Sequence, residues 1–358
     1  MNSYLKSRQF IFFPINLSHS VSLRFVNEIQ NKMNRVGRIK IGVIGVGHLG
    51  NHHVKHLSDI PEANLIGIFD TDREKSNSIS KKYNTETFDD LNTLIQSCEA
   101  LSVVTPTQHH AGIAEECLRS KKHIFIEKPI TSTLPEADNL LGLAEESGTI
   151  IQVGHIERFN PAFMALETSN LQPLFIETHR LAPFNPRGND VPVILDLMIH
   201  DLDIVLSLVK SEIKDIRANG VKVVSSTVDI ANARLEFENG CVANITASRI
   251  SQKSMRKIRL FQEKDYITID FQSGEVEEYK ICSTPPDLST GDQVVELAGA
   301  EKRYIHYHKP VITQHDALKE ELIHFADSII QGQQPEIDGH SAAEALKLAL
   351  EIQKIIDS

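Results

Sequence analysis

Five short apolar runs alternate with helix-like stretches in the first half of the chain, and this alternation constrains the fold most strongly. The runs are rich in Val and Ile on both faces, as expected for strands that are buried on two sides. They are Ile39–Ile44, Asn64–Phe69, Ala100–Val104, His123–Ile126 and Ile150–Val153. Each gap is long enough for a helix, so the pattern predicts βαβ units and a parallel sheet.

A glycine-rich loop, Gly45-Val46-Gly47-His48-Leu49-Gly50, follows the first predicted strand and precedes a helix. In this G-x-G-x-x-G spacing the first glycine permits a tight turn and the second lets the backbone approach a pyrophosphate. The third lets the helix pack closely on the strand. Asp70 ends the next strand, 20 residues after Gly50, where an acid can bind the adenosine ribose. We therefore predict an α/β Rossmann domain whose NAD-binding residues are Gly45, Gly47, His48, Leu49, Gly50 and Asp70.

The residues around Asp70 also bear on the choice of dinucleotide. Asp70 and Asp72 together would repel a 2′-phosphate, which favours NAD over NADP. Arg73 is close enough to leave some use of NADP open.

The second half of the chain has a different pattern. An extended stretch at Phe175–Leu181 and a strongly apolar helix at Val193–Val209 precede alternating strands on both sides of Asn239-Gly240. Asn-Gly between such strands predicts a type I′ hairpin. Later strands and helices are expected at Ile258–Phe261, Ile267–Phe271, Val276–Ile281, Ala317–Ile330 and Ser341–Ile356. We predict an α+β domain with an open, mainly antiparallel sheet, helices on one face, and self-association through the other.

At roughly 150 residues per domain, 358 residues correspond to about two domains. We place a flexible leader at 1–36, the NAD-binding domain at 37–158 and the α+β substrate and oligomerisation domain at 159–358. The leader is basic and contains a short apolar patch, Phe10–Ile15, interrupted by Pro14. A signal peptide, or a natural start at Met33, are the alternatives.

Charge and cysteine content exclude several kinds of protein. Lys and Arg number 37 against 48 Asp and Glu, a net charge of −11, which argues against nucleic-acid and anionic-membrane partners. No apolar run approaches the ~20 residues of a membrane span. The cysteines contain no C-x-x-C pair, so we expect a reducing cytoplasm. They are Cys98, Cys117, Cys241 and Cys282.

Three further motifs occur in order along the chain. Thr105-Pro106 follows the third strand, Glu127-Lys128-Pro129 follows the fourth, and Asp196-Leu197-Met198-Ile199-His200 lies in the apolar helix. With the glycine loop, this order resembles the Gfo/Idh/MocA oxidoreductases, the family of glucose–fructose oxidoreductase and inositol dehydrogenase. The resemblance covers about Arg38 to Ser358.

The chemistry of these residues agrees with an active site. Lys128 lies at the carboxyl end of a parallel strand, where open α/β sheets bind ligands, and Pro129 keeps it extended. Asp196, His200 and Asp203 share one face of an apolar helix, where ionisable groups must be paired or face a wet cavity. For Asp203 we expect a structural pair.

The resemblance implies a role for each residue. Lys128 contacts the reacting hydroxyl, His200 is the general base, and Asp196 orients His200 or binds the substrate. The implied cofactor contacts are Thr105, Pro106, His110, Glu127 and Lys128. The Glu-Lys-Pro turn often has a cis peptide in this family. We expect no metal at His109 and His110, because no third ligand has suitable spacing.

Two arginine-containing segments bear on the substrate. Arg158 and Asn160 lie in the link between the domains, although Asn160-Pro161 also reads as a helix cap. Arg180 and Arg187 precede the apolar helix and could bind a diphosphate. These segments resemble the branch that oxidises nucleotide sugars. The resemblance implies oxidation at the 3-OH of a UDP-sugar such as UDP-N-acetylglucosamine, for a surface sugar or lipid A. A dehydrogenase of inositol or a free sugar, or a non-catalytic NAD-dependent regulator, is the alternative. We expect a homodimer or homotetramer.

Overall fold

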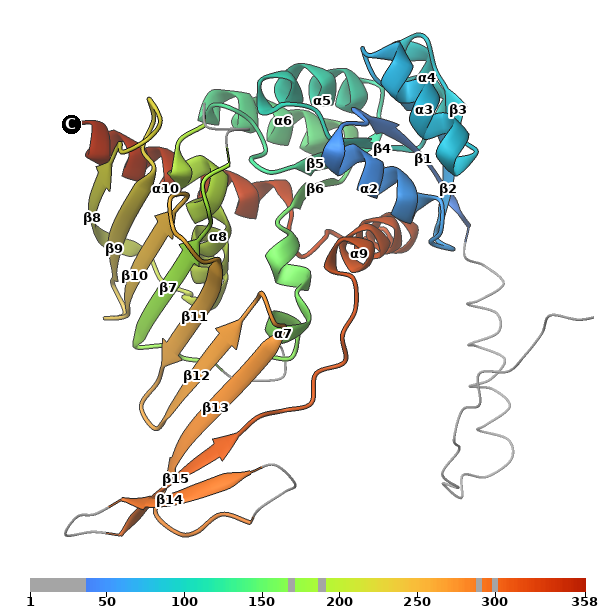
Figure 1. Cartoon of the computed structure of the whole chain (residues 1–358). Helices are drawn as coiled ribbons and strands as arrows, with labels where there is room; N and C mark the ends of the chain where they lie inside the picture. The colour runs from blue at the N-terminus through green and yellow to red at the C-terminus, as the bar shows by residue number, and fades with distance from the viewer. Residues whose placement is uncertain (1–36, 167–170, 186–190, 288–291, 298–301) are drawn as a thin grey trace, which may run out of the picture. The chain divides into compact units, whose positions relative to one another are not determined.

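The computed structural model describes residues 37–166, 171–185, 191–287, 292–297 and 302–358. Arg187 lies outside these residues. Ile39–Ser358 form one compact unit that contains two β-sheets (Figure 1).

The first sheet is parallel and has the strand order β3-β2-β1-β4-β5-β6. Its strands are β1 Ile39–Ile44, β2 Ala63–Phe69, β3 Glu86–Thr87, β4 Ala100–Val103, β5 His123–Glu127 and β6 Ile151–Gly154. This confirms the predicted parallel sheet; only the two-residue edge strand β3 was not expected. Chain order reverses between β1 and β4, which places a ligand crevice at the carboxyl ends of these strands.

Helices cover both faces of the first sheet. They are α2 His48–Leu57, α3 Arg73–Tyr83, α4 Leu91–Ser97, α5 His110–Arg119 and α6 Leu134–Ser147. Alternate residues of β1 enter opposite layers: Ile41 and Val43 pack with α2, whereas Ile44 packs with the layer of α5 and α6. Helix α9, Ala317–Gln331, returns from the end of the chain and inserts Leu322 and Phe325 into the α2 layer.

The second sheet has nine strands in the order β14-β15-β13-β12-β11-β7-β10-β9-β8. All neighbours are antiparallel except β7 and β10, which are parallel. The strands are β7 Phe175–Leu181, β8 Ile213–Val221, β9 Ile230–Phe237, β10 Val242–Ser248, β11 Met255–Phe261, β12 Asp265–Asp270, β13 Glu275–Cys282, β14 Gln293–Leu297 and β15 Arg303–His308. The mainly antiparallel sheet is confirmed, and β8, β14 and β15 were missed.

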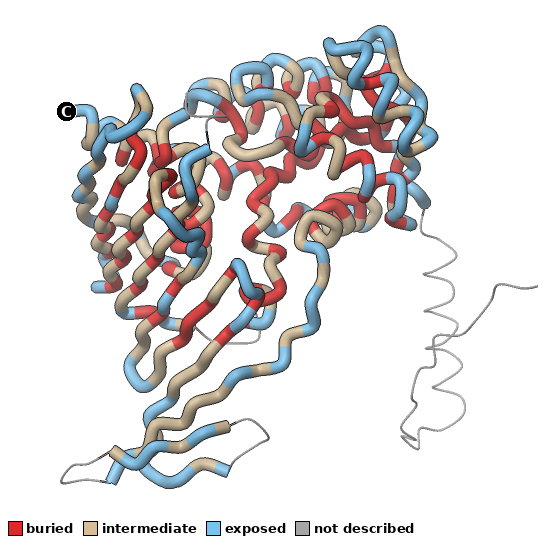
Figure 2. Tube along the Cα trace, viewed as in Figure 1, coloured by how far each residue is buried: buried red, intermediate tan, exposed pale blue. Residues whose placement is uncertain are grey.

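Helices cover one face of this sheet. The predicted helix at 193–209 begins as a π-helical segment, Ile194–Met198, and continues as α8, Ile199–Leu208. Together with α10, Gly339–Asp357, it encloses a core that includes Ile176, Leu235 and Ile258. Buried residues concentrate in the part of the sheet beneath the helices, whereas β14 and β15 contain no buried residue (Figure 2).

The hairpin between β9 and β10 differs from the prediction. Gly240 has φ +87°, but Asn239 is not among the described residues with positive φ, so the turn is not type I′. Phe237 N donates to Cys241 O and Gly240 N donates to Phe237 O, which encloses a three-residue loop ending in glycine. Such a loop is a type I turn followed by a left-handed glycine, and the sequence Asn-Gly is compatible with it as well as with a type I′ turn.

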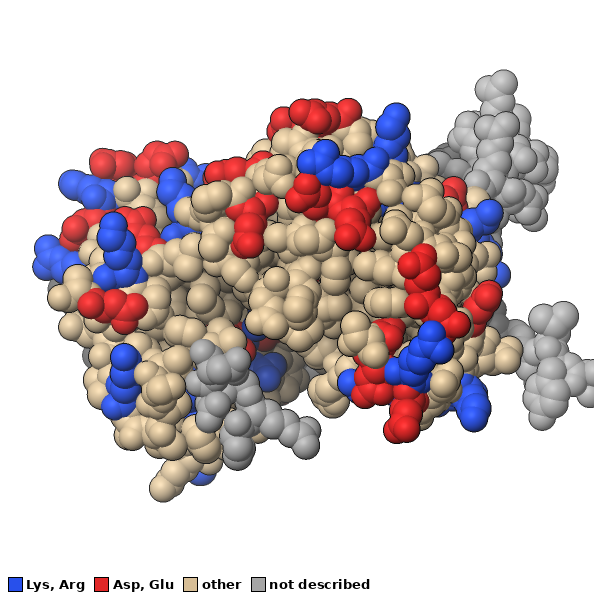
Figure 3. Space-filling view, turned by 90° about the horizontal axis from the view of Figure 1, so that it is seen from above, with Lys and Arg blue, Asp and Glu red and all other residues tan. Residues whose placement is uncertain are grey.

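The surface carries charges of both signs. On the face seen in Figure 3, lysines and arginines are interspersed with acidic residues. No helix in the described ranges is long and apolar enough to cross a membrane.

Candidate active site

The three glycines of the loop have the geometry that a dinucleotide requires. Gly45 has φ +87°, and a Cβ there would lie 2.6 Å from the carbonyl oxygen of Val104. A Cβ on Gly50 would lie 1.9 Å from the carbonyl oxygen of Gly45, so only glycine lets α2 pack this closely on the turn. A Cβ on Gly47 would meet no atom within 4 Å, which leaves its backbone open to a phosphate. The loop therefore fits a pyrophosphate at the start of α2.

Asp70 lies at the end of β2 beside this loop. Its Oδ2 accepts from the backbone N–H of Val46 and its Oδ1 from that of Asp72, both at 2.8 Å. Each carboxylate oxygen has a further lone pair, so a ribose hydroxyl can still donate to it. A small pocket beside Asp70 is lined in part by Arg73. The Arg73 guanidinium lies 3.0 Å from Asp89, and both side chains are largely exposed.

Lys128 connects the two domains. It follows β5, its peptide bond to Pro129 is cis, and its Nζ donates to the backbone carbonyl of Asp196 at 2.7 Å. The Asp196 carboxylate lies 3.5 Å from the same Nζ. Burial lowers the pKa of Lys128, while the charges of Asp196 and Glu127 act in the opposite direction. The structure thus brings Lys128 and Asp196 together, although they are 68 positions apart.

His200 lies one turn after Asp196, close enough to Lys128 to be affected by its charge. Burial, then the charges of Lys128 and Arg180, lower the pKa of His200 well below its ordinary value. Its Nδ1 is buried and has no hydrogen-bond partner among the described residues. The imidazole is therefore neutral at neutral pH and able to accept a proton.

The residues expected along the cofactor lie at the carboxyl ends of β4 and β5. Thr105 follows β4, and its Oγ1 is buried without a partner in the described part of the chain. His110 begins α5, and its ring nitrogens lie 2.8 Å from the Thr105 carbonyl and 2.9 Å from the Pro129 carbonyl. His110 thus holds the Thr105-Pro106 turn against the Lys128-Pro129 turn. The Glu127 side chain points to α2, where its Oε1 lies 2.9 Å from Nε2 of His53.

The link between the domains contains a buried ion pair. Arg158 donates to both carboxylate oxygens of Asp203, at 2.7 and 2.9 Å. The exposed fractions of the two side chains are 10% and 2%. Asp203 therefore forms a structural pair, with Arg158 as its partner, and two N–H groups of Arg158 are engaged by this carboxylate. Asn160 caps α7, Pro161–Met164, by accepting from the backbone N–H of Ala162 at 3.1 Å.

Arg180 is also held by carboxylates. It donates to Glu157 at 2.7 Å and to Asp201 at 2.8 and 3.1 Å, and only 4% of its side chain is exposed. Burial opposes its charge, but Asp201 and Glu157 stabilise that charge and raise the pKa of Arg180. Three of its five N–H donors thus bind carboxylates. This burial argues against the diphosphate contact expected for Arg180, which stays a prediction.

Two histidines near the site were missed by the sequence analysis. His53 lies on α2, three residues after Gly50, and is completely buried. His155 follows β6, and its ring stands edge-on to that of His200 with 6.3 Å between the centroids. Neither ring nitrogen of His155 has a hydrogen-bond partner among the described residues. For His155 a signal existed, because it occupies the end of a parallel strand just as Lys128 does.

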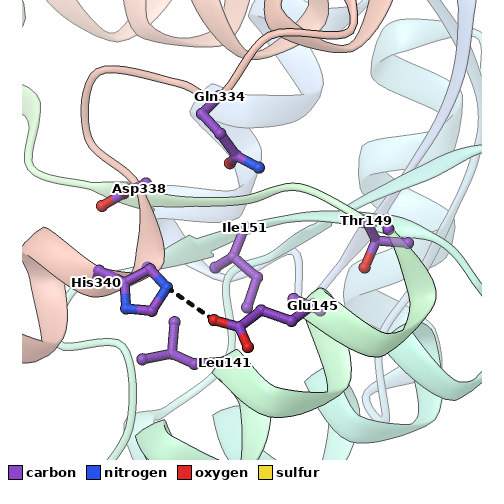
Figure 4. Close-up of a pocket in the computed structure, with 10 residues that line it drawn as sticks. Leu141, Glu145, Thr149, Ile151, Gln334, Asp338 and His340 are labelled. Carbon is purple, nitrogen blue, oxygen red and sulfur yellow. Dashed lines mark ion pairs between the residues drawn. The ribbon is translucent and has the colours of Figure 1, made fainter.

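A separate pocket lies between the end of α6 and the start of α10 (Figure 4). His340 and Glu145 form an ion pair of 3.5 Å across it, and both side chains are largely exposed. Ile151, the first residue of β6, lines this pocket, which places it at the edge of the sheet opposite to Lys128. Ligands of open α/β sheets bind at the carboxyl edge, so this pocket is not part of the active site.

Known proteins share both the sequence and the arrangement of this chain. The model of the oxidoreductase family with an NAD-binding Rossmann fold, GFO_IDH_MocA, matches residues 39–155, and the GFO/IDH/MocA C-terminal domain matches residues 176–268. UDP-N-acetylglucosamine 3-dehydrogenase of Acidithiobacillus ferrooxidans is 34% identical over 89% of this chain and 98% of its own. Its solved structure has a TM-score of 0.82 over 90% of this chain and 98% of its own, at 33% identity.

Two more distant proteins also match, one by sequence and one by structure. Myo-inositol 2-dehydrogenase of Thermotoga maritima is 25% identical over 89% of this chain and 96% of its own. Levoglucosan dehydrogenase in complex with NADH has a TM-score of 0.75 over 90% of this chain and 97% of its own; at 16% identity it shows the fold alone. The glycine loop has the geometry that NAD requires, two family models match the chain, and one relative matches it over nearly its whole length. The chain therefore belongs to the GFO/IDH/MocA family of NAD-binding oxidoreductases.

Proposed function

We propose that this enzyme oxidises a hydroxyl of a nucleotide sugar to a ketone with NAD, and that the position is the 3-OH of a UDP-sugar such as UDP-N-acetylglucosamine. The observation that carries the proposal is the meeting of Lys128, from the Rossmann domain, with Asp196 and His200, from the second domain. The relative from Acidithiobacillus ferrooxidans supports the choice of substrate, because the chains correspond over nearly their full lengths.

The dinucleotide site and the residues Lys128, Asp196 and His200 have separate roles in the proposed reaction. The glycine loop and Asp70 would hold NAD, which when bound supplies the acceptor for the hydride on the substrate carbon. His200 is the general base: its neutral imidazole accepts the proton of the alcohol. Lys128 binds the same oxygen as a cation and stabilises its negative charge as the proton leaves. Asp196 fixes the Lys128 ammonium with both its carbonyl and its carboxylate.

Arg256 is our candidate for the diphosphate. It lies on β11, its side chain is 55% exposed, and its Nη1 is 3.6 Å from Glu157. Its charge also acts on His200, so it lies near the site. A half-exposed guanidinium can turn to a phosphate at little cost, whereas the buried Arg180 and Arg158 cannot. Arg187 stays a prediction.

We further propose that two copies pack through the sheet face opposite α8 and α10. Paired positions on this face carry an aromatic ladder across five strands: Phe175, Phe261, Tyr266, Tyr279 and Tyr307. Successive ring centroids lie 5.8, 5.1, 4.5 and 5.1 Å apart. An extended apolar surface of this kind is typical of a protein interface. A homodimer, or a homotetramer made from two of them, would cover it.

The test is a substrate panel with purified enzyme and NAD. We expect the near-ultraviolet absorbance of reduced nicotinamide to rise with UDP-N-acetylglucosamine, and the product to be the 3-keto sugar by mass spectrometry and NMR. If product forms only when a 2-oxo acid is added, the cofactor is recycled in place. Turnover of inositol but not of nucleotide sugars would favour the activity named for the Thermotoga maritima relative, and turnover of free sugars alone would favour a free-sugar dehydrogenase. NAD binding without turnover of any sugar would favour a regulator.

A further inference from the structure

The completely buried His53 connects the dinucleotide-binding helix to the Glu-Lys-Pro turn. Its Nδ1 lies 2.9 Å from Oγ of Ser102 on β4, and its Nε2 lies 2.9 Å from Oε1 of Glu127 at the end of β5. The ring also stands edge-on to Phe125, with 5.3 Å between the centroids. Three contacts on three sides fix the imidazole in one orientation.

The hydrogen bonds assign a direction to this network. A carboxylate can only accept, so Nε2 of His53 donates to Glu127. In the neutral ring, Nδ1 then accepts from the hydroxyl of Ser102. A Cβ on Gly154 would lie 3.0 Å from the other carboxylate oxygen of Glu127, so this glycine leaves the room that the carboxylate occupies. Both ring nitrogens of His53 thus have a hydrogen-bond partner, and the Glu127 carboxylate fits against Gly154.

We propose that His53 is a positioning residue that anchors the Glu127 carboxylate beneath the active site and thereby keeps the neighbouring Lys128 charged and oriented. The proposal rests on the role of Lys128 in the proposed function. Because α2 begins at the glycine loop, the helix that receives the dinucleotide also fixes the turn that carries the catalytic lysine.

The electrostatics give the proposal a measurable consequence. Burial alone would raise the pKa of Glu127, but the hydrogen bond that His53 donates, together with the charge of Lys128, lowers it. Burial lowers the pKa of Lys128, Asp196 and Glu127 raise it, and Arg180 lowers it. The imidazoles of His155 and His200 face the same site. Without His53, the Glu127 carboxylate is no longer held in place and can turn away from Lys128, so Lys128 loses part of the attraction that raises its pKa.

The experiment measures the titration of Lys128 in the protein without cofactor or sugar. Lys128 is labelled with acetic anhydride over a range of pH, and its modification rate is followed by peptide mass spectrometry. We expect H53F to move the titration of Lys128 to lower pH by about one unit. E127Q should cause a similar shift, and H53F should add nothing in the E127Q background. H53Q, which retains an N–H donor, should restore much of the wild-type titration.

His56 offers a matched control on the same helix. It is buried and lies 3.3 Å from Asp316, but that carboxylate caps α9 rather than adjoining Lys128. H56F should therefore leave the titration of Lys128 unchanged. An unshifted titration in folded H53F, or an additional shift of H53F in the E127Q background, would overturn the proposal. If H53F does not fold, H53A, alone and combined with E127Q, replaces it in the same comparison, because H53A also removes the N–H donor. Because no substrate is present, failure to oxidise UDP-sugars would leave this result intact.

Discussion

Replacing Arg180 with methionine separates a structural arginine from a substrate-binding one. The substitution preserves much of the apolar stem but removes three hydrogen bonds, and it leaves Glu157 and Asp201 facing each other in the core. Removing one partner of a buried ion pair costs about 3–5 kcal/mol. Since domains are stable by only about 5–15 kcal/mol, R180M should unfold at a much lower denaturant concentration than the wild type.

The pH dependence of this loss follows from Asp201. Burial raises the pKa of Asp201, and Arg180 opposes that rise. Without Arg180 the pKa rises further, so the cost of keeping this carboxylate ionised in the folded protein increases. That cost is absent below the pKa of the unfolded chain and grows as pH rises toward the folded pKa. The stability gap between R180M and wild type should therefore be smaller at about pH 5 than at about pH 8.

Urea denaturation at the two pH values, with R256M as the matched control, tests this reasoning. The half-exposed Arg256 should contribute less than about 1 kcal/mol to stability, while its loss raises KM for a UDP-sugar about tenfold. If R180M instead unfolds like the wild type and only its KM rises, then Arg180 serves the substrate and the argument from its burial is refuted.

Three further substitutions test the site and the sheet face. H200N should lower kcat by about 10²- to 10⁴-fold without weakening NAD binding. Because the pKa of His200 lies well below its ordinary value, kcat/KM of the wild type should fall only in acid below the usual imidazole range; a fall centred within that range would contradict the assignment. D70S should weaken NAD binding about tenfold and improve the relative affinity for NADP, as measured by fluorescence titration. Y279R should dissociate the oligomer in light scattering, yet the chain should stay folded, because one cross-strand pair contributes only about 0.2–1 kcal/mol.

The sequence predicts the Rossmann domain well because its strands are buried on two sides. Such strands appear in the sequence as continuous apolar runs. In Ile39–Ile44, for example, every residue except Lys40 is buried. The three missed strands of the second sheet lack this contrast. β8 is an edge strand with no buried residue, and β14 and β15 lie beyond the helices that cover the rest. Where the inward residues are only partly buried, as Ile213 and Ile216 of β8 are, alternation gives a weak hydrophobic signal.

The position of Lys128 was easier to predict from the sequence than the partners of the arginines, for a physical reason. Lys128 directly follows a parallel strand, so its position at the carboxyl edge of the sheet can be predicted without knowing its distant partners. The roles of Arg158 and Arg180 depend on carboxylates 45 and 21 positions away, and spacing says nothing about these partners. One signal for Arg180 was present, because period-two alternation puts it on the face of Ile176, which enters the core.

The same ion pairs explain why His200 can be positioned accurately. Asp201 and Asp203 follow it on α8 and bind arginines from β7 and from the link between the domains. A buried ion pair need not add stability over apolar packing, but it tolerates only one register, because a shifted partner leaves a charge unsatisfied. A slide or rotation of α8 would break both pairs at once. The arginines that resemble phosphate ligands in the sequence therefore fix the helix that carries His200, next to the segment in which Asp196 meets Lys128.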